Sequence, residues 1–128
     1  MEDCILRTIP SEISMLRIGT REVPCRVAGS GPPLLCSELP LNPFARISLL
    51  QDQLAATHTV YLIDLRPVIG DPAAPPSTGL LEFLADFSLR ILDELGIGQC
   101  RIMGSFMYAG VAMQMAIMAP DRIRQLIF

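Results

Sequence analysis

One histidine, four cysteines and a group of methionines are the residue types in this chain that could bind a metal or act as a base or nucleophile. The cysteines form no C-x-x-C pair, and their spacing matches neither a zinc site nor a disulfide framework. They are Cys4, Cys25, Cys36 and Cys100. We expect them to be small buried apolar side chains in a reducing compartment, the cytoplasm. His58 stands in the polar segment Thr57-His58-Thr59, which predicts a solvated loop residue.

The methionines gather in the last quarter of the chain, at Met103, Met107, Met113, Met115 and Met118. A soft metal held by thioethers would need thiolate or imidazole partners beside them, and the spacing suggests none. Methionine commonly fills irregular gaps in a core. The sequence therefore predicts core packing here, with no metal site and no cofactor.

The composition indicates a single folded domain. The chain has 128 residues, of which 51% are hydrophobic and 18% charged, and its net charge is −3. Mean hydropathy is +0.44, which excludes intrinsic disorder. All ten basic side chains are arginine, and they form no cluster, so nucleic acid is not an expected partner. The acidic start lacks the features of a signal peptide, and the apolar stretch 103–120 is interrupted by polar residues, so we expect no membrane span.

The hydrophobic pattern alternates between strands and helices. Residues 12–28 read as a β-hairpin around Gly19-Thr20, and 34–36, 60–63, 100–103 and 123–128 read as buried strands. Helices are predicted over 43–57, 79–95 with Thr78 as its N-cap, and 107–118, and a long loop over 65–78. This order predicts an α/β protein with three layers, α/β/α, and a mostly parallel sheet that starts with a hairpin. The domain covers 12–128, after a lead-in at 1–11.

Several segments in this order resemble the α/β-hydrolase superfamily of esterases, lipases and peptidases. They are 27–34, 54–66, 92–97, 103–107 and 119–123. The resemblance covers only the N-terminal half of that fold, so it implies a truncated version of it. In the family order, the acid and the histidine of the catalytic triad follow the nucleophile and lie beyond the last strand present here.

The resemblance implies a nucleophile turn at Gly104-Ser105-Phe106-Met107-Tyr108. In the family, a serine stands there on a strained strand-to-helix bend flanked by glycines, because larger side chains would clash. Aligned on Gly104, the nucleophile position holds Phe106 and the second glycine position holds Tyr108. Phenylalanine cannot attack a carbonyl. A shift by one residue would make Ser105 the nucleophile, between Met103 and Met107; otherwise its hydroxyl satisfies the turn or caps the following helix.

The resemblance also places the oxyanion region at Cys36-Ser37-Glu38-Leu39-Pro40. Glu38 stands where the family has histidine and Leu39 where it has glycine. A carboxylate beside a developing anion opposes catalysis, and Pro40 lacks a backbone donor. Asp64 matches a family position that ties down the next loop, and we expect a structural role for it. If a small hydrophobic ligand binds, Ser37, Glu38, Leu39, Phe106 and Met107 are expected to line its site.

These residues favour a catalytically inactive hydrolase-like protein, either a scaffold for interactions or a truncated remnant. The alternative is the N-terminal segment of an active serine-type ester or amide hydrolase, completed by further sequence or by another chain. A nucleotide site at Gly29-Ser30-Gly31 is a third idea, which fails because these glycines lead into prolines and a strand, not a helix. The apolar edge at 123–128 predicts a covering element: the rest of a longer protein, a second copy or a partner subunit.

Overall fold

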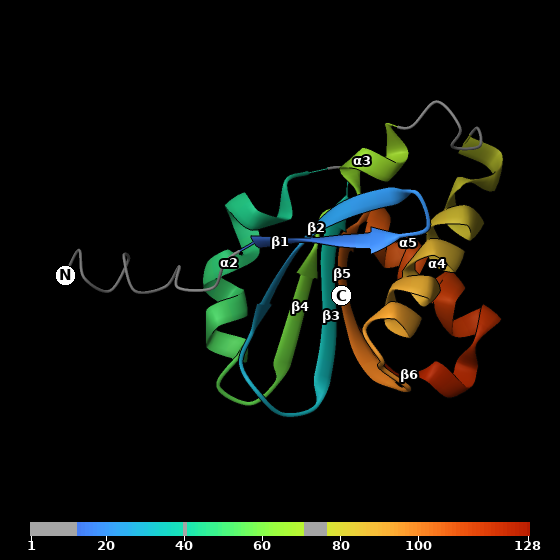
Figure 1. Cartoon of the computed structure of the whole chain (residues 1–128). Helices are drawn as coiled ribbons and strands as arrows, with labels where there is room; N and C mark the ends of the chain where they lie inside the picture. Colours follow the sequence, from blue (N-terminus) through green and yellow to red (C-terminus); the bar gives the residue numbers. More distant parts are fainter. Residues whose placement is uncertain (1–12, 40, 71–76) are drawn as a thin grey trace.

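A six-stranded mixed sheet forms the centre of the molecule (Figure 1). The computed structural model describes residues 13–39, 41–70 and 77–128. The strands are β1 (Ile13–Ile18), β2 (Arg21–Ala28), β3 (Pro33–Leu39), β4 (Thr59–Ile63), β5 (Cys100–Phe106) and β6 (Ile123–Ile127). The helices are α2 (Pro43–Leu54), α3 (Arg66–Ile69), α4 (Ser77–Glu94) and α5 (Met107–Met118), with a 3₁₀ turn, η1 (Pro120–Arg122). The predicted lead-in at 1–11 lies outside the described residues.

The strand order is β1-β2-β4-β3-β5-β6. The hairpin strands β1 and β2 pair antiparallel, and β2 pairs antiparallel with β4. The remaining pairs, β3 with β4, β3 with β5 and β5 with β6, are parallel. The predicted mostly parallel sheet with an N-terminal hairpin is therefore confirmed.

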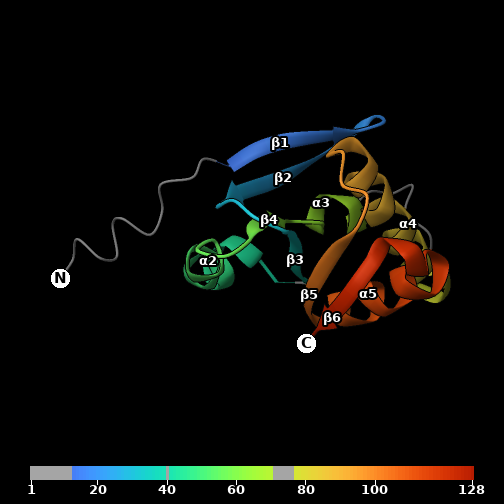
Figure 2. The same ribbon diagram turned by 90° about the horizontal axis from the view of Figure 1, so that it is seen from below.

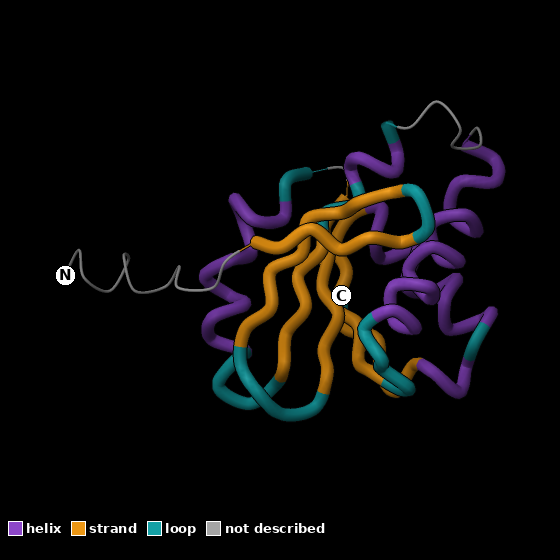
Figure 3. Tube along the Cα trace, viewed as in Figure 1, coloured by secondary structure: helices purple, strands orange, loops and turns teal. Residues whose placement is uncertain are grey.

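Helices cover both faces of this sheet, which confirms the three-layer architecture (Figures 2 and 3). Helix α2 packs on β3 and β4, while α4 and α5 pack on each other on the opposite face. The α2 face buries a small core, Leu34, Cys36, Val60 and Leu62. The α4–α5 face buries the larger core, which extends from Ile18 and Val23 to Met115.

The structure corrects several predicted boundaries. The predicted loop 65–78 contains the short helix α3, which Pro67 can open in its first turn and which buried Val68 anchors. Helix α4 begins at Ser77, so Thr78 lies inside it and is not its N-cap. Strands β3 and β5 run on to Leu39 and Phe106, because β3 and β5 continue to pair beyond their apolar starts.

The methionine prediction holds for only part of the group. Met115 is fully buried, but Met113 is 51% exposed and Met118 is 42% exposed. Helix α5 is apolar on all sides, whereas α4 and the sheet cover only part of its circumference. The same helix leaves Ile117 73% exposed. Among residues 13–39, 41–70 and 77–128, no helix has both the length and the apolar character needed to cross a membrane.

Three cysteines are buried free thiols. They are Cys25, Cys36 and Cys100, while Cys4 lies outside the described residues. Burial raises the pKa of Cys25 to about 11, of Cys36 to about 12 and of Cys100 to about 11. Since the thiolate is the reactive form, these side chains are chemically inert near neutral pH.

The raised thiol pKa values predict alkaline destabilisation. Unfolded thiols ionise near pKa 9.0, whereas the folded ones stay neutral until about 11 to 12. The stabilisation is therefore fully present below pH 9.0 and is lost as the pH rises toward the folded values. Urea unfolding compared at about pH 8 and about pH 10.5 is expected to show a lower midpoint at the higher pH. The pH dependence should be smaller in Cys36→Val; an unchanged dependence in that variant would contradict this assignment.

Candidate functional site at the C-terminal edge of the sheet

The carboxyl ends of β3, β4 and β5 bring most of the predicted site residues to one edge of the sheet. The parallel ladder sets Glu38 opposite Ser105 and Leu39 opposite Phe106. Asp64 follows β4 at the same edge. In an open α/β sheet, this is the edge at which ligands usually bind.

Phe106 forms the bend between β5 and α5. Its φ is 58° and its ψ is −129°, and it is the one non-glycine residue with a positive φ in the described part of the chain. A bulky side chain in this backbone region is strained by about 1–3 kcal/mol, and such strain concentrates at functional sites. The bend leaves the phenyl ring 61% exposed.

Gly104 makes this bend sterically feasible. A Cβ atom at Gly104 would lie 2.9 Å from the backbone oxygen of Tyr108 and 3.1 Å from its ring. Strand β5 and the first turn of α5 therefore touch at a point where only glycine fits. This contact forces the chain to pass from strand to helix within a few residues.

Tyr108 occupies the second glycine position of the family turn, and its side chain packs into the core. Its side chain is fully buried and its hydroxyl donates to Ser88 Oγ on α4 at 3.0 Å. Burial is the main cause of the raised pKa of this phenol, and the hydrogen bond between Tyr108 and Ser88 partly offsets that rise. The second glycine position of the family pattern is therefore filled here by a ring that reaches α4 and is fully buried.

Ser105 lies one residue before the bend, in the extended strand and partly buried. Its backbone does not share the positive φ of Phe106. The start of α5 has no side-chain cap, and within the described residues the Ser105 hydroxyl has no hydrogen-bond partner. The expectation that it satisfies the turn or caps the helix was therefore wrong, since the strand holds it away from the helix N–H groups.

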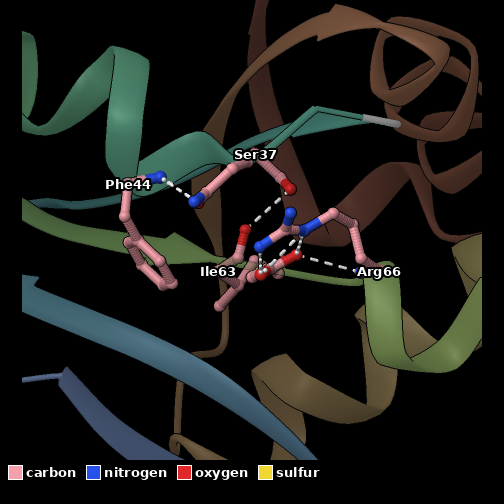
Figure 4. Close-up of polar contacts among 6 residues, drawn as sticks. Ser37, Phe44, Ile63 and Arg66 are labelled. Atoms are coloured by element: carbon pink, nitrogen blue, oxygen red, sulfur yellow. Dashed lines mark hydrogen bonds and ion pairs between the residues drawn. The ribbon is translucent and has the colours of Figure 1, made fainter.

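The predicted oxyanion segment is packed into the sheet. Ser37 is fully buried and its hydroxyl donates to the Ile63 carbonyl at 2.8 Å, which ties β3 to β4 (Figure 4). Leu39 is fully buried and Glu38 is 4% exposed. Pro40 lies outside the described residues. Neither of the two strand residues that precede it presents a small, open backbone of the kind a glycine would provide.

Asp64 anchors the loop after β4 through Arg66. Its carboxylate is 4% exposed and accepts the Arg66 backbone N–H at 3.0 Å, Nε at 3.0 Å and Nη2 at 2.7 Å (Figure 4). These hydrogen bonds raise the pKa of the Arg66 guanidinium. The role of Arg66 was not predicted, although its position two residues after Asp64 at a strand end is a readable signal.

Asn42 fixes the other loop at this edge. Its side-chain oxygen accepts the Phe44 N–H at 3.1 Å and caps α2, whose first residue is Pro43 (Figure 4). Pro43 was predicted to open this helix, and it does; the capping role of Asn42 was not predicted.

His58 lies at the opposite end of the sheet. Its Nδ1 is 2.8 Å from Thr57 Oγ1, and its Nε2 is 3.4 Å from Arg101 Nη1. It lies in the loop before β4, as predicted, but it is half-buried and both ring nitrogens have a contact, which the sequence did not indicate. Over the described ranges, no three histidine, cysteine or acidic side chains gather closely enough to hold a metal ion.

Comparisons with known proteins agree with this geometry. The chain is 27% identical to a proposed α/β hydrolase from Nostoc sp. PCC 7120, with a TM-score of 0.76 over 93% of this chain and 42% of that one. A proposed epoxide hydrolase from Pseudomonas aeruginosa is 24% identical, with a TM-score of 0.78 over 92% of this chain and 40% of that one. The chain has the α/β-hydrolase fold. It corresponds to the N-terminal half of that fold and spans less than half the length of these hydrolases.

The sequence itself adds one distant relative of this α/β-hydrolase-like chain. It is 38% identical over 72 residues to the dihydrolipoyllysine-residue acetyltransferase component of an acetoin cleaving system from Cupriavidus necator. The match covers 56% of this chain and 19% of that protein. No protein-family profile matches the sequence.

The contact at Gly104 predicts a matched pair of stability effects. Gly104→Ala is expected to lower the free energy of unfolding by about 1–3 kcal/mol, because its new methyl group meets backbone. Gly98→Ala is the control: its Cβ would meet nothing within 4 Å. That variant should be neutral or more stable by about 0.4–1 kcal/mol, since alanine restricts the unfolded chain. Equal effects in urea unfolding would contradict the steric argument.

The strained bend predicts that, at Phe106, a glycine variant is more stable than an alanine variant, the reverse of the usual order in a helix. Phe106→Gly and Phe106→Ala both remove the ring, so their difference reports the backbone. The glycine variant is expected to be more stable by about 1 kcal/mol, because glycine adopts positive φ freely. At exposed Ile117, inside α5, the usual order should hold and alanine should be more stable by about 1 kcal/mol. Thermal unfolding of the four variants measures both differences.

Proposed function

We propose that this α/β-hydrolase-like protein is catalytically inactive and works as an interaction scaffold. The observation that carries the proposal is the identity of the residue on the bend: Phe106 holds the strained, exposed conformation between β5 and α5. In α/β hydrolases the nucleophile stands on such a strand-to-helix turn. A phenyl ring has no lone pair with which to attack a carbonyl, so this position cannot form an acyl-enzyme.

The surroundings of Phe106 support the same reading. Ser105, the nearest hydroxyl in sequence, stays in the extended strand opposite buried Glu38. A serine nucleophile needs a base within hydrogen-bond reach, and His58 is bonded to Thr57 and Arg101 at the other end of β5. A buried carboxylate beside the reacting position would also oppose an oxyanion.

We propose that a partner surface covers β6 and the outer side of α5. Strand β6 pairs only with β5 in the described sheet, and Phe128 is 68% exposed beyond it. Exposed apolar side chains on α5 extend this surface. A second copy, a partner subunit or the remainder of a longer protein would bury it. The buried free thiols support a reducing location, the cytoplasm.

Two finer proposals concern the C-terminal edge. Phe106 and Met107 offer an apolar contact for a small hydrophobic ligand, beside Ser37, Glu38 and Leu39.

The alternative is that this chain is the N-terminal segment of an active serine-type hydrolase. It is favoured by the fact that the chain covers less than half of the solved hydrolases. The acetyltransferase named for the Cupriavidus relative is not carried over, because the match spans 19% of that protein.

The test is turnover and active-site labelling of the native polypeptide purified from its source. We expect no hydrolysis of short-chain p-nitrophenyl esters and no labelling by a fluorophosphonate probe. Phe106→Ser alone should remain inactive, because the rest of the catalytic machinery is not beside it. A commercial serine esterase, assayed in parallel, is the positive control.

Hydrolysis or labelling of the native polypeptide that disappears in Ser105→Ala but persists in Phe106→Ala would establish the alternative instead. Turnover created by Phe106→Ser would also overturn the proposal, because it would place an intact base and oxyanion site around the bend.

A further inference from the structure

A cavity lies at the end of the sheet opposite Phe106. Its volume is about 330 Å³, and its lining consists of Pro32, Pro33, Gln99, Cys100, Arg101 and Arg124. These residues come from the turn before β3 and from the starts of β5 and β6, which lie at the lower end of the sheet (Figures 1 and 3). Arg101 precedes Phe106 by five positions along β5, roughly 16 Å of extended strand. The cavity is therefore separate from the site described above.

Two arginines on adjacent strands meet in this cavity. Between Cys100 and Arg101 the β5–β6 register shifts: Cys100 pairs with Ile123, and Arg101 pairs with Gln125. Arg124 is the extra residue of this bulge. A bulge re-aims the side chain of the residue it inserts, and here both Arg101 and Arg124 line the same hollow.

Both guanidinium groups are bonded to glutamine oxygens, and Arg101 also lies beside His58. Arg101 Nε donates to Gln125 Oε1 at 3.0 Å, and its Nη1 lies 3.4 Å from His58 Nε2. Arg124 Nη1 donates to Gln99 Oε1 at 3.3 Å. A guanidinium carries five N–H donors, so most of the donors in this pair are not used by these bonds.

Four other arginines in the described residues are paired with carboxylates. Such ion pairs join Arg17 to Glu22, Arg26 to Asp52, Arg66 to Asp64 and Arg122 to Asp93. Within the described ranges, Arg101 and Arg124 form no ion pair. The charge of these two side chains is therefore available to an anionic ligand that enters the cavity.

We propose that this cavity binds the phosphate group of a small phosphate monoester. Two converging guanidinium groups match a doubly charged oxyanion, because each can present parallel N–H donors to two oxygens. The neutral glutamines hold the arginines in place without competing for their charge. The prolines give the opposite wall a rigid, apolar surface for the organic part, and the volume falls at the lower end of the usual range for small-molecule sites, about 300–1,000 Å³.

Calorimetric titration of the intact chain with inorganic phosphate and with glucose 6-phosphate, at about 0.15 M ionic strength, tests the proposal. We expect saturable binding of both, tighter for the sugar phosphate. Arg101→Gln and Arg124→Gln should each weaken it at least about tenfold, as the loss of a charge-assisted contact implies. Arg17→Gln is the matched control, since Arg17 is exposed and paired with Glu22 far from the cavity, and its affinity should equal that of the parent.

Circular dichroism and thermal unfolding of each variant separate lost binding from lost folding. Absence of saturable binding by the folded parent chain would overturn the proposal, and so would equal affinity in the folded Arg101 and Arg124 variants. Stronger binding of a phosphoserine peptide than of glucose 6-phosphate would overturn the small-molecule assignment. These readouts do not involve ester hydrolysis, so they are independent of the outcome at Phe106.

Discussion

The close contact between Gly104 on β5 and the backbone of Tyr108 on α5 is the constraint that determines the geometry at the C-terminal edge of the sheet. Strand and helix approach so closely there that a methyl group would strike a carbonyl oxygen. The chain must therefore reverse within the residues between them, and the reversal places Phe106 at positive φ. The exposure of its ring and the burial of Tyr108 are consequences of the same turn.

Tyr108 adds a second support that a glycine at this position could not provide. Its ring fills space between α4 and α5, and its hydroxyl reaches Ser88 on α4. A fully buried phenol with a satisfied hydroxyl contributes packing at little polar cost. The buried Tyr108 side chain thus stabilises the turn, while the exposed side chain on the turn, Phe106, carries no nucleophilic group. A fold of this kind does not by itself define a chemistry, because function depends on the side chains placed on it.

The two ends of the sheet differ in how charge is managed. At the carboxyl end, Asp64 and Arg66 satisfy each other through several hydrogen bonds and fix a loop. At the amino end, Arg101 and Arg124 rest on glutamine oxygens, which orient a guanidinium without neutralising it. The first arrangement is a closed structural unit. The arrangement of Arg101 and Arg124 places two positive charges beside the cavity. It depends on the single bulge between β5 and β6.

The sequence alone determined the class of fold and most of its elements. Turn residues and local hydrophobic patterns are short-range signals, and they located the hairpin, the parallel strands and helix 107–118 at the bounds observed for α5. The resemblance to the α/β-hydrolase superfamily, aligned on Gly104, placed Phe106 at the junction of strand and helix. What only the tertiary structure decided depends on partners distant in the chain. The direction of the Tyr108 ring, the exposure of Met113 and Met118 and the bonds of His58 are set by α4, by the sheet edge and by Arg101. The meeting of Arg101 and Arg124 likewise required a register shift, which no local pattern of side chains encodes.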